Sequence, residues 1–574
     1  MDMEDICTYI EERTQRWVSD GLENDFREWN HHHAVLIDAQ TGRGKNHFIM
    51  EKLIPYAWET GQQVLIFSNR VALSTQQKKL LFKKFAMPMI YTDNELRDIE
   101  NFGPVTILNY QSALKFLAPF LNQTSKHTPI GGFPMAGRPG LGYVVFDEAH
   151  FFLSDATFNA DTQRILESLV NAFSYYTRIY LTATPDNIVP IITFYEQANE
   201  GRRYETYYEL SAQLHKRILP RHTQYSKLTP ENVLVIYKFP QNYSDYNLIF
   251  FSNIDFLYEE IQKASKDNKW LLFINSKARQ REISAKLKEL PKRKKEIACF
   301  NAAKKGDEKV WNSLMEGNLP VNVFLTTRVL DNGVNISDSG LKNIVIEFED
   351  KISFLQMLGR KRRIDGEQIN VFVLSPSQQA VKERLIATQD LLSVIQDYRQ
   401  HNSNFLQRRW KDLHQEYRNL FWVNDMQQLE CNKFAEQELN YLLAFYSDLL
   451  FQMQNTSNPF DAYDIYPKLV LRWLGCPGEI QWLSADAAQR AVEELKSLLE
   501  QHLESVIPEE QTQIFFNRFK KLGDKIYSGK KTITNDSRSK RAIIERTLDD
   551  FQQQLSAHYK IAGKGKSGWT ISKE

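Results

Sequence analysis

The chain has 574 residues, 42% of them hydrophobic and 25% charged, and its formal net charge is +1. One hydrophobic core seldom serves so long a chain, so we expect two to four domains, and the near-neutral charge means that a nucleic-acid partner can be argued only from local features. The sequence has no apolar run of the ~20 residues that a membrane span needs, no signal-peptide pattern and only scattered cysteines, so we expect a cytoplasmic protein without membrane contact or structural zinc.

The first part of the chain is predicted to be an α/β domain. Residues 1–30 are expected to form a helical segment, and residues 31–190 then alternate short apolar runs with longer amphipathic stretches. This alternation is typical of a parallel sheet covered by helices. The strands expected in this domain are Ala34–Asp38, Gln63–Ser68, Val105–Asn109, Tyr143–Phe146 and Arg178–Leu181.

The same alternation returns in a second predicted domain. Residues 191–245 are expected to be a linker or insert with one strand at Val233–Tyr237, and residues 246–376 a second α/β domain. Residues 377–574 lack the strand pattern, so we expect a mainly α-helical C-terminal region that ends in a basic tail. The strands expected in the second domain are Trp270–Ile274, Val321–Leu325, Asn343–Phe348 and Ile369–Leu374.

A glycine-rich turn follows the first predicted strand and precedes an apolar helical stretch. Its backbone N–H groups can converge on the phosphates of ATP, its lysine supplies a positive charge, and the N-terminus of the following helix adds its dipole. Asn46 stands where a serine or threonine usually ligates magnesium, and a Gly-Lys turn without function is the alternative interpretation. The residues predicted to bind the nucleotide are Gln40, Thr41, Gly42, Arg43, Gly44, Lys45 and Asn46.

An acidic motif, Asp-Glu-Ala-His, follows the predicted strand Tyr143–Phe146. An aspartate at this end of a parallel strand faces the same crevice as the glycine-rich turn, so Asp147 is predicted to hold Mg²⁺ together with Asn46. Glu148 can then orient the attacking water. His150 either couples the nucleotide state to the next motif or is a buried histidine without such a role.

These two motifs resemble those of the superfamily 2 DEAD/DEAH-box helicases, and further motifs follow in the family's order over about Val35–Arg363. The resemblance implies two RecA-like parallel-sheet lobes in tandem, followed by the helical C-terminal region. It also implies a nucleotide contact from Gly333. The residues to which it gives coupling roles are His150, Thr182 and Thr184. The residues that it places on the nucleic-acid track are Asn69, Arg70, Tyr110, Gln111, Asn275, Ser276 and Thr327.

The last of these motifs, Gln-x-x-Gly-Arg-x-x-Arg, lies in the predicted second lobe. Its arginines can reach the γ-phosphate only when the two lobes close over ATP, and an arginine finger of this kind contributes ~10³–10⁵ in rate. A basic surface patch is the alternative interpretation of the segment. The residues to which the resemblance assigns catalysis are Glu148, Gln356, Arg360 and Arg363.

The resemblance therefore implies an ATP-driven helicase or translocase that contacts mainly the backbone of its strand. This form of the last motif, paired with Asp-Glu-Ala-His, is more similar to viral origin-binding and recombination-type DNA helicases than to DEAD-type RNA helicases, so we expect DNA. An RNA helicase and a nucleotide-gated binding subunit with vestigial hydrolysis are the alternatives, and Asn46 keeps the second one open. The basic stretch Arg518–Arg546 is either an auxiliary strand contact or solvated surface.

Overall fold

The computed structural model describes most of the chain. The described residues are 8–29, 34–69, 71–84, 95, 99–121, 140–174, 176–198, 233–265, 267–289, 296–301, 308–330, 334–362, 366–401, 415–424, 426–456, 461–476, 478–527, 533, 539–563 and 568–573. Three predicted site residues lie outside them, namely Arg70, Gly333 and Arg363.

Eight of the described strands form the sheet of the first lobe, in the order β1-β8-β2-β7-β6-β3-β5-β4. Neighbouring strands are parallel except at the β4–β5 edge. The strands are β1 (Thr8–Glu12), β2 (Ala34–Asp38), β3 (Gln63–Ser68), β4 (Asn101–Phe102), β5 (Val105–Asn109), β6 (Leu141–Phe146), β7 (Thr177–Thr182) and β8 (Leu234–Lys238). β2, β3, β6 and β7 are almost wholly buried, because helices cover both faces of the sheet.

Two strands of this sheet lie outside residues 31–190, where the first α/β domain was predicted, and the second of them matches the strand predicted at Val233–Tyr237. The strand β1 lies within residues 1–30, where a helical segment was expected, and only short helical pieces follow it. The strand β8 lies within the predicted linker 191–245 and pairs with both β1 and β2. The first lobe is therefore closed at one edge by segments from both of its ends, whereas the division of the chain at the other predicted boundaries stays a prediction.

Helices cover the two faces of the first sheet and bury separate cores. One face is covered by α1 (Val18–Leu22), η2 (Asp25–Arg27), α2 (Lys45–Phe48), the π-helix η3 (Ile49–Leu53), α3 (Ile54–Glu59) and α4 (Val71–Lys84). The other face is covered by η4 (Tyr110–Ser112), α6 (Ala113–Leu121), α7 (Phe151–Ser154) and α8 (Thr162–Ala172).

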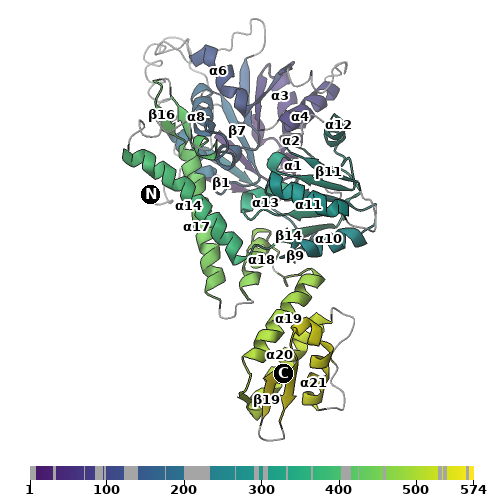
Figure 1. The fold of residues 1–574 in the computed structure, drawn as a ribbon. Helices are drawn as coiled ribbons and strands as arrows, with labels where there is room; N and C mark the ends of the chain where they lie inside the picture. The colour runs from purple at the N-terminus through teal and green to yellow at the C-terminus, as the bar shows by residue number, and fades with distance from the viewer. Residues whose placement is uncertain are drawn as a thin grey trace, which may run out of the picture.

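The second lobe has six described strands, all parallel, in the order β11-β12-β10-β13-β14-β9. They are β9 (Tyr246–Phe251), β10 (Lys269–Phe273), β11 (Ile297–Phe300), β12 (Val323–Thr326), β13 (Leu341–Ile346) and β14 (Ile369–Leu374). Its helices are α10 (Ile254–Lys263), α11 (Lys277–Glu289), α12 (Glu308–Met315), η6 (Arg328–Leu330) and α13 (Lys351–Leu358). Two parallel-sheet lobes in tandem are what the sequence predicted, and Figure 1 shows them side by side.

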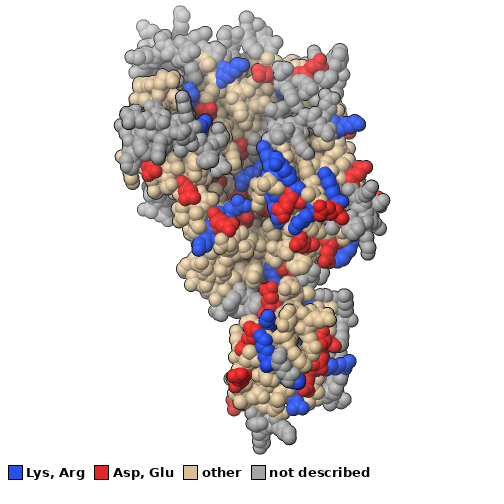
Figure 2. All heavy atoms as spheres, viewed as in Figure 1, with Lys and Arg blue, Asp and Glu red and all other residues tan. Residues whose placement is uncertain are grey.

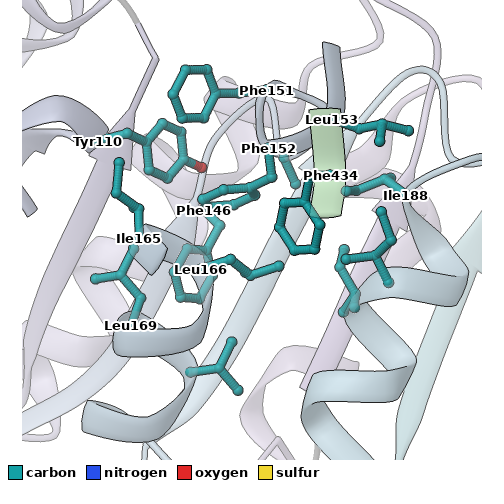
Figure 3. Packing of buried hydrophobic residues seen from close by; sticks show 14 of the residues in the cluster. Tyr110, Phe146, Phe151, Phe152, Leu153, Ile165, Leu166, Leu169, Ile188 and Phe434 are labelled. Atoms are coloured by element: carbon teal, nitrogen blue, oxygen red, sulfur yellow. The ribbon is translucent and has the colours of Figure 1, made fainter. Parts of the chain in front are cut away.

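A helical layer follows the second lobe and connects it back to the first. α17 packs along the long helix α14, and its first half contributes Phe434 and Leu439 to the core of the first lobe. Its second half contributes Tyr446 and Met453 to the core of the second lobe. Figure 3 shows Phe434 among the buried side chains of the first lobe, next to Phe152 and Ile188. The elements of this layer are α14 (Gln378–His401), α16 (Gln415–Arg418), β15 (Phe421–Val423), β16 (Leu429–Cys431), α17 (Lys433–Gln454) and α18 (Ala462–Trp473).

The last residues form a separate unit with a core of its own, lowest in Figure 1. Its elements are α19 (Ser484–Glu500), β17 (Val506–Ile507), α20 (Glu509–Ile526), α21 (Lys540–Asp550), α22 (Gln552–Leu555), β18 (Tyr559–Ala562) and β19 (Trp569–Lys573). The C-terminal region is mainly helical, as predicted, with two small antiparallel sheets in addition. Among the residues described, no helix combines the length and the apolar character of a membrane-spanning segment.

Candidate active site

The glycine-rich turn forms a nest at the end of β2. Gly42 and Gly44 have φ angles of +88° and +85°, a left-handed conformation that a residue with a Cβ adopts only under strain. Lys45 begins α2 and its Nζ donates to the carbonyl oxygen of Ala39 at 2.6 Å, so the amine lies inside the turn. Burial lowers the pKa of Lys45. The arrangement presents backbone N–H groups and a buried cation to one point, as phosphate binding requires.

Two residues predicted to bind the nucleotide have other partners. The side chain of Gln40 donates to the carbonyl oxygen of Asn242 at 2.9 Å and accepts from the Asn242 amide at 2.8 Å. Asn242 lies between β8 and β9, on the connection between the lobes. Arg43 is buried and its guanidinium donates to the Gln40 side chain. Gln40 and Arg43 therefore join the turn to the inter-lobe connection and do not line the cavity beside Lys45.

The other predicted turn residues enclose a cavity of about 240 Å³ with the acidic motif. Asp147 is buried, and its Oδ2 accepts a hydrogen bond from Gln77 Nε2 at 2.7 Å. Burial and the neighbouring Glu148 carboxylate raise the pKa of Asp147 to about 7. Carboxylate and amide oxygens are hard ligands, so the donor set of Asp147 and Asn46 fits Mg²⁺. The residues that line the cavity are Thr41, Gly42, Gly44, Lys45, Asn46, His47, Asp147, Glu148 and Arg362.

Glu148 has the conformation of a strained functional residue. Its φ angle is +54°, which is uncommon for a side chain of this kind, and the Asp147 amide is held by the carbonyl oxygen of Phe67 at the end of β3. Burial acts to raise the pKa of Glu148, but His150 and Lys45 outweigh it and hold that pKa below its usual range. Its carboxylate is thus ionised and lies in the cavity, as a water-orienting base requires.

Two arginines of the second lobe enter this site from the side opposite the turn. Arg360 is almost fully buried, and its Nη2 lies 3.6 Å from Glu148 Oε1 and 3.0 Å from Gln356 Oε1. Arg362 lines the cavity itself, and burial lowers its pKa to about 10. The sequence predicted Arg360 and Arg363 as the pair. The structure brings Arg360 and Arg362 to the site, whereas Arg363 lies outside the described residues.

The lobes touch closely where these arginines cross. A Cβ on Gly359 would lie 2.4 Å from the Cβ of Thr41, and a Cβ on Gly42 would lie 3.2 Å from Arg362 Nη1. Glycine is therefore needed at 359 because the helix end and the turn approach each other without room for a side chain. The two lobes are therefore in contact at the glycine-rich turn.

The predicted coupling residues lie directly beside the acidic motif. The amide of Ala149 donates to the carbonyl oxygen of Leu181 at 2.8 Å, which joins this motif to the end of β7. Thr182 Oγ1 accepts from the amide of Thr184 at 3.1 Å, and both threonines are buried. His150 is buried, with Nδ1 3.6 Å from Glu148 Oε2. One backbone hydrogen bond thus joins the acidic motif to the end of β7, where Thr182 and Thr184 follow.

A second cavity, of about 460 Å³, lies between the lobes. It brings together Asn275, Ser276 and Thr327, the three residues of the second lobe that were predicted to contact nucleic acid. Across from them the first lobe contributes Phe158, which is 61% exposed. The Arg328 guanidinium lies 5.6 Å from the Phe158 ring centre and 5.2 Å from that of Phe348. An exposed ring beside a cation suits base stacking and phosphate contact in one groove.

The first-lobe residues predicted on the nucleic-acid track differ among themselves. Gln111 is exposed, and its Nε2 donates to the carbonyl oxygen of Asn69 at 3.3 Å. Tyr110 is fully buried, stacks on Phe151 and donates to the carbonyl oxygen of Asp147 at 3.0 Å. Figure 3 shows its ring inside the core. Tyr110 therefore offers no surface to a strand in this structure, and it supports the acidic motif from behind.

Several residues of the site were not predicted from the sequence. Arg362 stands next to Arg363, which the motif spacing favoured, and Gln77 belongs to none of the motifs described above. Trp17 precedes the glycine-rich turn, and with Ser19, Asp20, Gly44 and His47 it lines a cavity of about 440 Å³ that shares two residues with the phosphate cavity. A tryptophan in a polar segment ahead of the turn was the sequence feature that could have pointed to this second cavity.

The fold and this site combine two parallel-sheet lobes, with the glycine-rich turn and the acidic motif on the first and arginines supplied by the second. Residues 6–187, which include most of the first lobe, match the family model described as type III restriction enzyme, res subunit. The search of curated proteins gave no match.

Two solved structures are among those that match part of this chain. S. cerevisiae Dbp5 bound to RNA and ADP BeF3 is 14% identical, with 60% of this chain and 79% of that chain covered and a TM-score of 0.38. The DEAD-box helicase Mss116 bound to ssRNA and UDP-BeF is 13% identical, with 82% of this chain and 100% of that chain covered and a TM-score of 0.41.

Proposed function

We propose that the chain is an ATP-driven helicase or translocase that moves on DNA and hydrolyses ATP when its lobes close on the strand. The observation that carries the proposal is the position of Arg362. This side chain belongs to the second lobe, yet it lines the phosphate cavity of the first lobe together with Lys45 and Glu148. A site completed by both lobes works only when they meet, so hydrolysis depends on whatever brings them together.

The residues of this chain divide the work of hydrolysis. Lys45 and the turn amides hold the β- and γ-phosphates, and Mg²⁺, held by Asn46 and Asp147, would neutralise their charge. Glu148 orients the water that attacks the γ-phosphate and accepts its proton. Arg362 stabilises charge on the transferred group, while Arg360, hydrogen-bonded to Gln356, keeps Glu148 in place from the second lobe.

The groove between the lobes is the proposed track for the strand. Asn275, Ser276 and Thr327 line it, and α11, which begins at its rim, carries exposed basic side chains. Figure 2 shows Lys and Arg side chains gathered over this helix, near the boundary of the lobes. Cations beside a groove with an exposed ring favour a single strand held by its phosphates and by stacking, with little sequence preference. The basic residues of α11 are Lys277, Arg279, Arg281, Lys286 and Lys288.

The choice of DNA rests on two features of the sequence. The last helicase motif has the form found in DNA helicases of the origin-binding and recombination type, and the matching family model is named for a restriction enzyme. We expect single-stranded DNA to reach half-maximal stimulation of ATP turnover at a lower concentration than RNA of the same length and sequence. The measurement is a titration of ATPase rate with each oligonucleotide. RNA stimulating at the lower concentration would overturn the DNA assignment and leave the motor intact.

Asn46 is the residue that favours the alternative of a nucleotide-gated binder. An asparagine carboxamide oxygen can ligate Mg²⁺, but it is longer than a threonine hydroxyl and its NH₂ must point away from the ion. We expect Asn46→Thr to leave turnover equal or higher and to lower the Mg²⁺ concentration needed for half-maximal rate. A magnesium titration of strand-stimulated ATPase for both proteins measures this. If only Asn46→Thr turns over ATP, the natural chain is a binder.

A further inference from the structure

The C-terminal unit has an order of elements that none of the helicase motifs explains. Along the chain it runs α19, β17, α20, α21, α22, β18 and β19, and its strands form one antiparallel sheet in the order β17-β19-β18. A helix, a strand, two helices and a hairpin, with the first strand beside the last, are typical of the winged-helix fold. In related helix-turn-helix domains the later helix enters the major groove. We propose that residues 484–573 form a winged-helix domain that binds duplex nucleic acid through α21 and the hairpin β18–β19.

Two glycines lie at the base of the hairpin β18–β19, which is the proposed wing. Gly563 and Gly568 have φ angles of +142° and +77°. A Cβ on Gly563 would lie 2.2 Å from the carbonyl oxygen of Gly568, and one on Gly568 would lie 2.3 Å from that of Ile507. Arg541 Nη1 donates to the carbonyl oxygen of Gly563 at 2.8 Å, so the first turn of α21 is held against the wing base. The two parts of the proposed surface are therefore adjacent.

Charge is divided unevenly within this unit. Residues 484–517, which include α19, carry seven Asp or Glu and two Lys or Arg. Residues 518–573, which include the end of α20, all of α21 and the hairpin, carry fourteen Lys or Arg and five Asp or Glu. The positive charge of this unit thus lies in its second part, although α21 itself carries three basic and three acidic residues. A duplex carries one negative charge per ~1.7 Å of axis, so this division favours a nucleic-acid occupant over a neutral protein surface.

The outward face of α21 is free of the core of this unit. Ile543, Ile544, Thr547 and Leu548 are buried, which leaves Lys540, Glu545, Arg546, Asp549 and Asp550 exposed. The acidic residue Asp550 near the other end of the helix accepts a hydrogen bond from Tyr527. An α-helix with its side chains is about 10–12 Å across and the major groove of a duplex is about 12 Å wide, so the 11-residue helix α21 fits into it. Lys560 is exposed on β18, on the side of the strand opposite the buried Tyr559 and Ile561.

The unit is attached to the second lobe by backbone pairing. Leu483 donates to the carbonyl oxygen of Phe250, and Phe250 donates to that of Gln481, both at 2.8 Å, so the connecting segment extends the edge strand β9. The Asp486 side chain accepts from the amide and hydroxyl of Ser252. Because α19 starts at this junction, a duplex held by the unit moves with the second lobe.

The test uses the full-length protein with the double variant Lys540→Gln, Arg546→Gln and the matched control Lys496→Glu on α19. Both proteins lose two units of positive charge, but only the first loses it from the proposed surface. We expect the double variant to bind blunt duplex DNA on the order of tenfold more weakly, with the log–log salt slope reduced by about 0.9 for every phosphate that the variant no longer neutralises. The control should bind duplex as the unchanged protein does.

Single-strand-stimulated ATPase is measured on the same proteins, because neither α21 nor α19 belongs to the catalytic site. Unchanged stimulation together with weakened duplex binding supports the inference. Duplex affinity and salt slope equal to those of the unchanged protein overturn it, and so does an equal weakening in the control. Weaker single-strand binding with duplex binding intact also overturns it, since the surface then serves the strand. If single-stranded DNA does not stimulate the unchanged protein, the proposed function is contradicted. The duplex-binding result still tests the present inference on its own.

Discussion

Glu148→Gln is expected to lower ATP turnover by a factor on the order of 10²–10⁴ while ATP binding stays close to that of the unchanged protein. The carboxylate lies in the phosphate cavity, where His150 and Lys45 hold its pKa below the usual range, so it is ionised at neutral pH. Glutamine has nearly the same size and keeps the polar contacts of the backbone, but it cannot take a proton from water. The phosphate contacts through Lys45 and the turn are untouched.

The same variant also tests whether closure and strand binding are linked. With hydrolysis stopped, ATP should hold the lobes together, and single-stranded DNA should bind more tightly with ATP than without it. Turnover and ATP affinity are measured by a coupled assay and by equilibrium binding of a fluorescent ATP analogue. Turnover within a few-fold of the unchanged protein removes Glu148 from the role of base. An affinity for single-stranded DNA that is the same with and without ATP contradicts the closure model, even if turnover is abolished.

Arg362→Ala is expected to lower the turnover number by ~10³ or more, the magnitude associated with an arginine finger. Its guanidinium belongs to the second lobe and lines the cavity of the first lobe, so its loss removes charge from the transferred phosphoryl group. Arg360→Ala should reduce turnover as well, with little change in the KM for ATP, because that side chain contacts Glu148 and Gln356. A matched control is Arg472→Ala, an exposed arginine on α18.

The comparison with Arg363→Ala decides which arginine of the motif is the finger. The motif spacing favoured Arg363, whereas the cavity contains Arg362. A larger loss of turnover for Arg362→Ala than for Arg363→Ala supports the geometry. A large loss for Arg363→Ala with nearly normal turnover for Arg362→Ala returns the role to the residue that the sequence predicted.

Much of the fold could be predicted because buried parallel strands are continuous apolar runs. The strands β2, β3 and β5 have the bounds that the sequence suggested. β1 was missed because Thr8–Glu12 is polar and forms the edge of its sheet, where one side of the strand has no neighbour to pair with. Local sequence pattern carries no information about such pairing with β8, which lies more than two hundred residues away.

The candidate site could be predicted where a residue's place at the end of a strand decides whether it belongs to the site. It could be predicted less well where the direction of the side chain decides this. Lys45, Asp147 and Glu148 follow strands, and the ends of parallel strands meet at one edge. Tyr110 shares that edge, but its ring turns into the core, and only the packing of Phe151 against it reveals this. The choice between Arg362 and Arg363 depends on how two lobes meet, which no single segment encodes.

The helix α17 could not be assigned a role from its sequence for the same reason. It is amphipathic like any surface helix, yet Phe434 packs in one lobe and Tyr446 in the other. Its first turn is fixed to the first lobe, where Asn432 donates to Thr162 at 3.0 Å. A helix that contributes to both cores constrains how far the lobes can separate.

The most direct test of the central claim is the ATP turnover number of the full-length protein with and without single-stranded DNA, with Lys45→Ala as the background. Because lobe closure on the strand brings Arg362 to the phosphates, we expect the strand to raise turnover on the order of tenfold or more. Lys45→Ala should show no turnover in either condition. Turnover that is the same with and without DNA or RNA, or that survives in Lys45→Ala, would contradict a motor whose hydrolysis is completed by lobe closure.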